Sequence, residues 1–415
     1  MRKAVVQLGA GPIQRALLDE LVRAGIVPIV IDRSERPEGL VSGAVHLRAG
    51  IDEPTAVLHA LEARPRDVEP VAVLTSTDLG VASVPYVSRA LGLPHASSES
   101  IAAMDDKLEA KTRLARAGVD VPHGLLIGGA DELPALDDRA EFVVKPVDSS
   151  GSRGVRRVRG PAAISAAVEQ ALAFSPRVLV EECIEGAHLD INGFVFEGRF
   201  ELVAVGHRFF SPPPACVPLC GGIPAAQDPE LAHRIKQAMQ RAVEALDYRH
   251  GPIKADAIDS ARGLVLIELA ARFHGDVFSF HTMRAAGLVP AVFHWLERSG
   301  VGALSASVRP PARSRRTGAW LGIFAREEGT IEAIEGLDAL RSHAGFRAWI
   351  PRLGCGDRVG APTDNRALVG FEILSLESAA TPWLELERLR DLVTVVLRAE
   401  RVRSDRSPRV IAAGG

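Results

Sequence analysis

Several kinds of residue are scarce in this chain of 415 residues. It has 4 cysteines, too few for the disulfide framework that stabilises many small secreted domains. Its net charge of −3 excludes the strongly basic character typical of proteins that bind nucleic acid or anionic membranes. No apolar run reaches the roughly 18–20 residues of a membrane span, and Ala4–Leu8 is too short for a signal peptide. The sequence therefore predicts a cytoplasmic protein.

Lysine is also scarce, since 6 of the 49 basic residues are lysine and the rest are arginine. A lysine inside an apolar segment therefore indicates a site that needs a compact ammonium group. Lys145 is such a residue, within a predicted strand over Glu141–Val147. The Ser- and Gly-rich segment Asp148–Gly154 follows, and its N–H groups and hydroxyls could surround an anion, so we expect a flap over phosphates. The alternative is an ordinary hairpin beside a lysine that reaches solvent.

The remaining composition is that of a globular protein, with 47% hydrophobic and 24% charged residues. The length suggests roughly two to four compact units. Apolar strands alternate with helices near the N-terminus, which predicts a parallel sheet there. The expected fold class is α/β and α+β multidomain: a Rossmann-like unit at 1–100, a small α+β unit at 101–180, a larger unit at 181–308, a β-rich unit at 309–402 and a disordered tail at 403–415.

Other expectations concern single segments. Helical periodicity predicts one continuous helix over Ser100–Ala117 and another over Leu288–Arg298. Proline and glycine over Arg208–Pro224 predict a long loop that is functional or mobile. A final helix is expected over Glu385–Arg398, and Arg309–Arg316 is interpreted as a linker.

A glycine-rich turn, Gly9-Ala10-Gly11, follows the first predicted strand, and Asp32 ends the second. Dinucleotide-binding folds share this arrangement, in which the glycines approach a pyrophosphate and the acid binds a ribose. Gln14 stands where that motif has its third glycine. The pattern therefore favours a tight turn in a Rossmann-like scaffold over NAD(P) binding.

Two acidic residues are expected to face each other in a hairpin. Ile253–Ile258 and Leu264–Leu269 are predicted strands joined by a short turn. If the turn is centred near Arg262, Asp256 lies opposite Glu268, and two carboxylates in that position repel each other. A divalent cation between them would make the arrangement favourable, and Mg²⁺ that also carries phosphates suits such ligands. The alternative is a solvated edge with scattered charges.

The order of these features resembles the ATP-grasp superfamily and, within it, carboxylate–amine ligases such as the bacterial L-amino acid ligases. The resemblance covers most of the chain and rests on four strings: Met104–Lys107 (MDDK), Val143–Val155 (VVKPVDSSGSRGV), Val180–Gly186 (VEECIEG) and Ile267–Asp276 (IELAARFHGD). It implies an ATP-grasp fold with a small subdomain at 101–180 and a large one at 181–308. The β-rich end similarly resembles the C-terminal subdomain of the amino acid ligases.

The resemblance also implies roles for individual residues. Lys107 and Lys145 would contact the phosphates of ATP, and Arg272 would bind the substrate carboxylate or the transferred phosphoryl group. Lys145 and Arg272 are the expected catalytic residues. Other ATP contacts would come from the flap residues Ser150, Gly151, Ser152, Arg153 and Gly154 and from the adenine-binding segment Glu181, Glu182, Cys183 and Ile184. Mg²⁺, or Mn²⁺ in its place, would be held by Asp256 and Glu268, and the carboxylate pocket would include Gly275 and Asp276.

Two positions depart from the pattern of that family. His188 stands where a glutamate often binds the ribose, and it is kept among the ATP-binding candidates. Ala270 stands where an asparagine often follows the metal-binding glutamate, and Asp190 is a candidate substitute for the ribose contact. A base that deprotonates an amine would be useful, although single histidines are more often structural. The histidines considered for this role are His207, His274 and His281.

The predicted activity is ATP-dependent formation of an amide bond through an acyl phosphate, with release of ADP and phosphate. The expected partners are a small carboxylate, such as an amino acid, and an amine, without nucleic acid or membrane; relatives suggest a homodimer. Three alternatives stay open: a carboxylase that uses bicarbonate, an NAD(P)-dependent oxidoreductase, and a nucleotide-binding module without catalysis.

Overall fold

The computed structural model describes residues 1–275, 277–302, 316–377 and 382–398. The predicted linker at 309–316, except for Arg316, and the predicted tail at 403–415 lie outside these ranges. Within the described ranges, the helices are too short or too polar to cross a bilayer.

The N-terminal unit contains a four-stranded parallel sheet in the order β3-β2-β1-β4. Helix α1 packs on one face and α2 and α3 on the other, which explains why the central strand β1 is buried from Ala4 to Leu8. The expected Rossmann-like unit is therefore confirmed. Its elements are β1 (Arg2–Leu8), α1 (Arg15–Arg23), β2 (Val27–Asp32), β3 (Val45–Arg48), α2 (Pro54–Leu61), β4 (Val68–Thr75) and α3 (Ser83–Ala90).

The glycine-rich turn after β1 is packed within this unit. The carboxylate of Asp32 accepts a hydrogen bond from the N–H of Ala10 (3.0 Å). The N–H of Gly39 donates to the carbonyl of Ala10, and a Cβ on Gly39 would lie 2.1 Å from the carbonyl oxygen of Gly11. The segment at Gly39 thus covers the turn, which supports the scaffold interpretation rather than dinucleotide binding.

The prediction of one helix over Ser100–Ala117 was wrong. The structure has two helices, α4 (Ser98–Asp105) and α5 (Lys107–Arg116), separated at Asp106. Asp106 has an extended backbone, and its carboxylate accepts hydrogen bonds from two N–H groups in the first turn of α5. An aspartate favours such an N-cap because it satisfies N–H groups that have no partner within the helix. The break places Lys107 at the start of α5.

The small subdomain is an antiparallel sheet in the order β5-β8-β6-β7, covered by α6. Because β6 and β8 are neighbours with Val143 opposite Glu181, Lys145 and Glu181 lie on the same face of this sheet. The elements are β5 (Gly124–Ile127), β6 (Glu141–Pro146), β7 (Arg156–Arg159), α6 (Pro161–Leu172) and β8 (Val178–Glu182).

An eight-stranded antiparallel sheet, here called the large sheet, forms the centre of the molecule in the order β13-β12-β9-β10-β11-β14-β18-β16. Helix α7 (Pro229–Ala245) packs on β9, β10, β12 and β13 through its apolar side. The sheet therefore continues across the predicted boundary at residue 309. Its strands are β9 (Gly186–Phe196), β10 (Arg199–Phe210), β11 (Pro218–Ile223), β12 (Gly251–Ser260), β13 (Gly263–Ala270), β14 (Thr317–Phe324), β16 (Phe346–Pro351) and β18 (Leu368–Leu376).

The prediction of a long loop over Arg208–Pro224 was also wrong, because the loop is shorter than expected. Most of this segment belongs to β10 and β11, which pair from His207 opposite Gly222 to Phe210 opposite Pro218. Glycine is needed here because the strands are crowded: a Cβ on Gly222 would lie 2.3 Å from the carbonyl oxygen of Gly318. Only the turn between the strands remains as loop.

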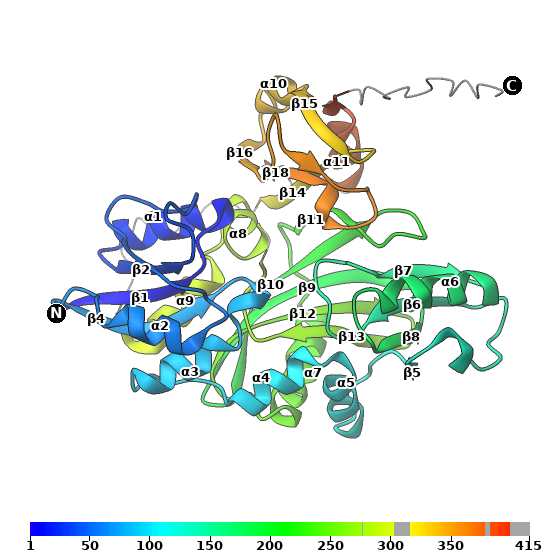
Figure 1. The fold of residues 1–415 in the computed structure, drawn as a ribbon, viewed down its shortest axis with the longest axis horizontal. Helices are drawn as coiled ribbons and strands as arrows, with labels where there is room; N and C mark the ends of the chain where they lie inside the picture. Colours follow the sequence, from blue (N-terminus) through cyan, green and yellow to red (C-terminus); the bar gives the residue numbers. More distant parts are fainter. Residues whose placement is uncertain (276, 303–315, 378–381, 399–415) are drawn as a thin grey trace, which may run out of the picture.

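The elements from β14 onward are called the C-terminal subdomain. The predicted helix Glu385–Arg398 was wrong in its second half, where the β-branched sequence Thr394–Leu397 forms β19. The helix predicted at Leu288–Arg298 begins only after Pro290. Figure 1 shows this subdomain at one end of the large sheet, with the N-terminal unit and the small subdomain on opposite sides. The remaining elements are α8 (Met283–Ala285), α9 (Ala291–Leu296), β15 (Gly329–Glu335), α10 (Leu337–Arg341), β17 (Arg358–Val359), α11 (Pro382–Arg390) and β19 (Thr394–Leu397).

Candidate active site

A cavity of about 590 Å³ lies where the small subdomain, the large sheet and the C-terminal subdomain meet. It brings together candidate residues that are far apart in the sequence. Arg153 and Gly154 are not part of its lining, and Asp276 lies outside the described residues. The predicted residues that line it are Lys107, Lys145, Ser150, Gly151, Ser152, Glu181, Glu182, Cys183, Ile184, His188, Asp256, Glu268, Arg272 and Gly275.

The predicted flap, Ser150–Gly154, is a tight turn at the cavity. Its φ angles are 68° at Gly151, 61° at Ser152 and 73° at Gly154, a region of backbone space that favours glycine. A Cβ on Gly154 would also lie 2.8 Å from the ring of Phe174. The two glycines therefore allow the turn to form close to the small subdomain.

Lys107 stands at the base of this flap. Its Nζ donates hydrogen bonds to the carbonyls of Val147 (3.2 Å) and Ser149 (2.8 Å). The Nε of Arg153 donates back to the carbonyl of Ser150 (3.0 Å), within the flap. Lys107 thus places a positive charge where the flap meets α5.

Lys145 is buried, and its Nζ lies 2.7 Å from a carboxylate oxygen of Glu181. Glu181 forms a second ion pair with Lys111, whose pKa is lowered to about 7 by burial and by the nearby charge of Lys145. Burial acts against the charge of Lys145, but the Glu181 carboxylate outweighs it and the pKa of Lys145 is raised. Because this carboxylate is paired with two lysines, any adenine contact at this position would fall to the backbone.

The segment after Glu181 is held by its own contacts. The carboxylate of Glu182 accepts hydrogen bonds from the N–H of His123 (2.9 Å) and from Arg262 (2.8 Å). The N–H of Cys183 donates to the carbonyl of Glu141 (3.0 Å). These bonds fix the backbone of the segment at the cavity wall.

His188 packs against Phe210, with ring centroids 4.8 Å apart. Burial lowers the pKa of His188, so its ring is neutral at physiological pH. The side chain therefore presents an uncharged surface to the cavity.

The acidic pair of the hairpin forms as predicted, since Asp256 lies opposite Glu268 in the register of β12 and β13. Lys254, which the sequence analysis gave no role, lies between them: its Nζ is 2.8 Å from Asp256 and 3.9 Å from Glu268. Burial acts to raise the pKa of both carboxyls, but the charge of Lys254 lowers both below their usual values. The spacing of two residues between Lys254 and Asp256 was the available sequence signal.

The pair also fits a divalent cation. Lys254 binds Oδ2 of Asp256, whereas Oδ1 is buried and has no hydrogen-bond partner in the described part of the chain. A buried carboxylate oxygen without a partner is costly, and a hard cation would satisfy it. Glu268 faces the same cavity and supplies a second oxygen donor.

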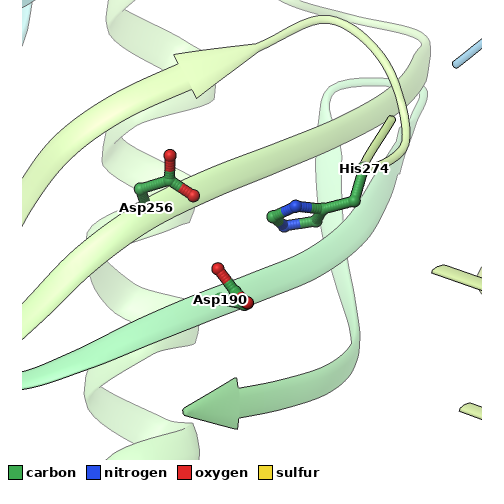
Figure 2. Close-up of side chains that lie close together, drawn as sticks. All are labelled: Asp190, Asp256 and His274. Carbon is green, nitrogen blue, oxygen red and sulfur yellow. The ribbon is translucent and has the colours of Figure 1, made fainter. Parts of the chain in front are cut away.

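A second set of donors shares Asp256. One ligand atom each from Asp190, Asp256 and His274 lies within 4.8 Å of the others, and Figure 2 shows the three side chains pointing toward one another. Asp190 is also paired with Arg208 (2.8 Å), which places a positive charge beside this set. Asp256 is common to both sets, and each set has a cation beside it, Arg208 at this triplet and Lys254 at the pair.

The N-terminal unit contributes to the site through Asp78, which the sequence analysis missed. Arg272 is buried and donates from both Nε and Nη2 to one oxygen of Asp78, each at 2.6 Å. Gly275 passes so close to this unit that a Cβ would lie 2.5 Å from the carbonyl oxygen of Ser76. Burial and the charge of Asp78 raise the pKa of nearby Asp105 to about 6.

The three candidate bases occupy different surroundings. His274 lines the cavity. A ring nitrogen of His281 is 3.0 Å from the carbonyl oxygen of Ile13, and His207 packs against Trp383 in the C-terminal subdomain. Of the three, His274 is therefore the candidate that lies at the cavity.

Residues 104–276 match the model of the ATP-grasp domain, and residues 323–398 match L-amino acid ligase C-terminal domain 2. The uncharacterized protein y4rH of Sinorhizobium fredii is 28% identical over 64% of this chain and 55% of its own length. A D-alanine–D-alanine ligase of Mycolicibacterium vanbaalenii is 33% identical over 31% of this chain and 34% of its own length. The chain thus spans about half or less of these curated relatives.

Solved structures show the fold over nearly the whole chain. The L-amino acid ligase from Bacillus licheniformis matches with a TM-score of 0.77 and 18% identity, covering 96% of this chain and all of that one. An ADP complex of N5-carboxyaminoimidazole ribonucleotide synthetase matches with a TM-score of 0.70 and 15% identity, covering 94% of this chain and 96% of that one. The expected arrangement of a Rossmann-like unit, an ATP-grasp fold and a C-terminal subdomain is confirmed.

Proposed function

We propose that this chain, which belongs to the ATP-grasp superfamily, is an ATP-dependent ligase that joins a small carboxylate to an amine through an acyl phosphate. One observation carries the proposal: a single cavity collects buried lysines, a glycine-rich flap, a facing carboxylate pair and a buried arginine. Phosphoryl transfer needs these groups, because negative charge on the transferring group must be positioned and neutralised. The matches to L-amino acid and D-alanine ligases support a carboxylate and an amine as substrates.

The small subdomain would bind the phosphates of ATP. Lys107 and Lys145 supply positive charge near the start of the flap, and the flap N–H groups would close over the phosphates. Asp256 and Glu268 would hold Mg²⁺. When bound, the ion draws electron density from the phosphate oxygens.

Arg272 would hold the carboxylate substrate. Asp78 holds a carboxylate oxygen against two of its N–H groups, and this contact supports a role for the guanidinium in binding an anion. A carboxylate oxygen of the substrate attacks the γ-phosphorus, and the bond from that phosphorus to the oxygen of ADP breaks. The amine then attacks the carbonyl carbon of the acyl phosphate, phosphate leaves, and the nitrogen loses its proton.

The proposal is tested by measuring phosphate release from MgATP with pairwise pools of amino acids and small acids, and by identifying the products by mass spectrometry. We expect release that needs both an acid and an amine, with formation of an amide. Glu268→Gln and Arg272→Ala should abolish this release without changing the circular dichroism spectrum. Glu169→Gln, at an exposed position of α6, is the matched control and should retain full activity.

Two results would contradict the proposal. Full turnover by both Glu268→Gln and Arg272→Ala would remove the assignment of the site. ADP formation that depends on bicarbonate and needs no amine would indicate a carboxylase instead.

A further inference from the structure

Seven lysine and arginine side chains line the cavity, and six of them have either a carboxylate partner or two acceptors within the described part of the chain. Five are paired with carboxylates, and Lys107 binds two backbone carbonyls. These six are Lys107, Lys145, Arg157, Arg208, Lys254 and Arg272.

Arg352, the seventh, has neither a carboxylate partner nor a second acceptor for its side chain within the described ranges. It follows β16 in the C-terminal subdomain, and its guanidinium donates to one group only, the carbonyl of Asn365 (3.2 Å). No carboxylate in the described ranges forms an ion pair with it, its side chain is exposed to solvent at the cavity, and its guanidinium is charged at neutral pH. Most of its N–H groups are therefore available to an anion that enters the cavity.

The surroundings of Arg352 indicate what kind of anion this is. The neighbouring wall of the C-terminal subdomain is apolar, formed by Trp320, Leu368 and Phe371. The residues assigned above to ATP, metal and the carboxylate substrate come from α5, the small subdomain, β12, β13 and the segment after β13. Arg352 thus stands on a wall that none of these assignments uses.

The wall of the cavity that carries Arg352 also lies close to the flap. The side-chain amide of Asn365 is 3.9 Å from the position that a Cβ on Gly151 would occupy in the flap. Arg352 is therefore close to the end of the flap, where an amine must approach an acyl phosphate. A planar guanidinium binds a carboxylate with two parallel hydrogen bonds.

We propose that Arg352 binds the carboxylate of the amine substrate, so that this substrate is itself an amino acid held by the C-terminal subdomain. The inference rests on the proposed ligase function. It assigns the C-terminal subdomain a direct part in selecting the second substrate.

The test compares nucleophiles with and without a carboxylate. The acid and the amino acid that acts as amine are taken from the pairwise panel, and the carboxamide of that amino acid and hydroxylamine serve as the other nucleophiles. Arg352→Gln should raise KM for the amino acid about 10- to 100-fold, because a charged hydrogen-bonded pair is lost. The KM values for the carboxamide, for ATP and for the acid should change less than twofold, and Arg352→Lys should recover part of the loss.

Hydroxylamine separates this inference from the function on which it rests. It traps an acyl phosphate as a hydroxamate and has no carboxylate, so Arg352→Gln should form hydroxamate at the rate of the unchanged protein. Absence of hydroxamate with every acid tested would contradict the ligase proposal itself. If hydroxamate does form, any of three results would overturn the role of Arg352. These are an unchanged KM of Arg352→Gln for the amino acid, a raised KM for ATP, or a panel in which no amino acid acts as the amine.

Arg347→Gln is the matched control. Arg347 lies on the same strand, β16, donates only to the backbone carbonyls of Ala344 and Phe346, and does not line the cavity. Its replacement should leave all four KM values unchanged.

Discussion

Replacing Glu372 with glutamine is expected to stabilise the C-terminal subdomain at pH 8 and to have much less effect at pH 5. Glu372 is fully buried in β18, opposite Leu321 and Trp349 in the neighbouring strands. Neither carboxylate oxygen has a hydrogen-bond partner within the described ranges. Burial raises the pKa of Glu372 from its ordinary 4.5 to about 7.

The sign of the effect follows from the direction of this shift. Because the pKa is higher in the folded protein, the protonated form is favoured by folding, and its contribution to stability is fully present below about pH 4.5. The contribution is lost as the pH rises from 4.5 to about 7, and the shift corresponds to about 3 kcal/mol in total. Glutamine has the same shape and does not titrate, so its own burial cost is the same at every pH.

The assay is urea unfolding at pH 5 and pH 8, followed by tryptophan fluorescence. Three of the 4 tryptophans, Trp320, Trp349 and Trp383, belong to this subdomain and report its unfolding. Between pH 5 and pH 8, the stability of Glu372→Gln relative to the unchanged protein should rise by about 2–3 kcal/mol. Glu332→Gln, at an exposed position of β15, should show no such change. Equal differences at the two pH values would refute the reasoning, because they would mean that the buried carboxyl does not titrate differently in the folded state.

Three further predictions concern the cavity. Lys254→Met removes the cation between two facing carboxylates, so thermal unfolding in EDTA should show a loss of about 2 kcal/mol, part of which Mg²⁺ restores. Gly154→Ala forces a Cβ toward the ring of Phe174 at a positive φ, so kcat/KM for ATP should fall at least tenfold while the C-terminal subdomain unfolds as before. Asp105 becomes neutral as the pH falls through about 6, so Asp105→Asn should remove a step near pH 6 from the pH profile of kcat/KM for the acid substrate.

Each of these variants has a control elsewhere in the chain. Lys236→Met changes an exposed lysine of α7, and it should be insensitive to Mg²⁺. Gly198→Ala places a Cβ at a similar positive φ, but with no neighbour within 4 Å. A similar loss of activity in Gly198→Ala would show that the effect of Gly154→Ala does not arise from the flap. Asp138→Asn removes an exposed carboxyl, and its pH profile should keep the step near pH 6. Loss of this step in Asp138→Asn would contradict the assignment of the step to Asp105.

The hairpin of β12 and β13 shows how much of the site the sequence alone could predict. A short turn fixes the register of two antiparallel strands, so the pairing of Asp256 with Glu268 followed from local information. The strand that carries Lys145 and the flap were predictable for the same reason. The prediction of a single helix over Ser100–Ala117 failed for a different reason. The helical periodicity of the sequence continues across Asp106, although the chain is extended there and the Asp106 carboxylate caps the start of a second helix.

The contacts that the sequence analysis missed join segments from different units. Asp78 follows β4 in the N-terminal unit, yet it pairs with Arg272 after β13. Arg352 enters the cavity from the C-terminal subdomain. Such pairs depend on how packed units are placed relative to one another, and neither periodicity nor spacing along the chain carries that information.

Two groups of side chains on different walls of the cavity carry net charges of opposite sign. At the flap side, Lys107 binds backbone carbonyls and Lys145 shares the single carboxylate of Glu181 with Lys111, whose pKa is about 7, so this group is left with a net positive charge. At the large sheet, Lys254 serves both Asp256 and Glu268, so that group is left with a net negative charge. Phosphates are attracted to the first group and a divalent cation to the second, and a Mg²⁺–phosphate complex spanning the cavity would neutralise both. In the proposed function, the ion pairs would orient the nucleotide with its phosphates between the flap and the large sheet, which would leave the side of Arg352 for the second substrate.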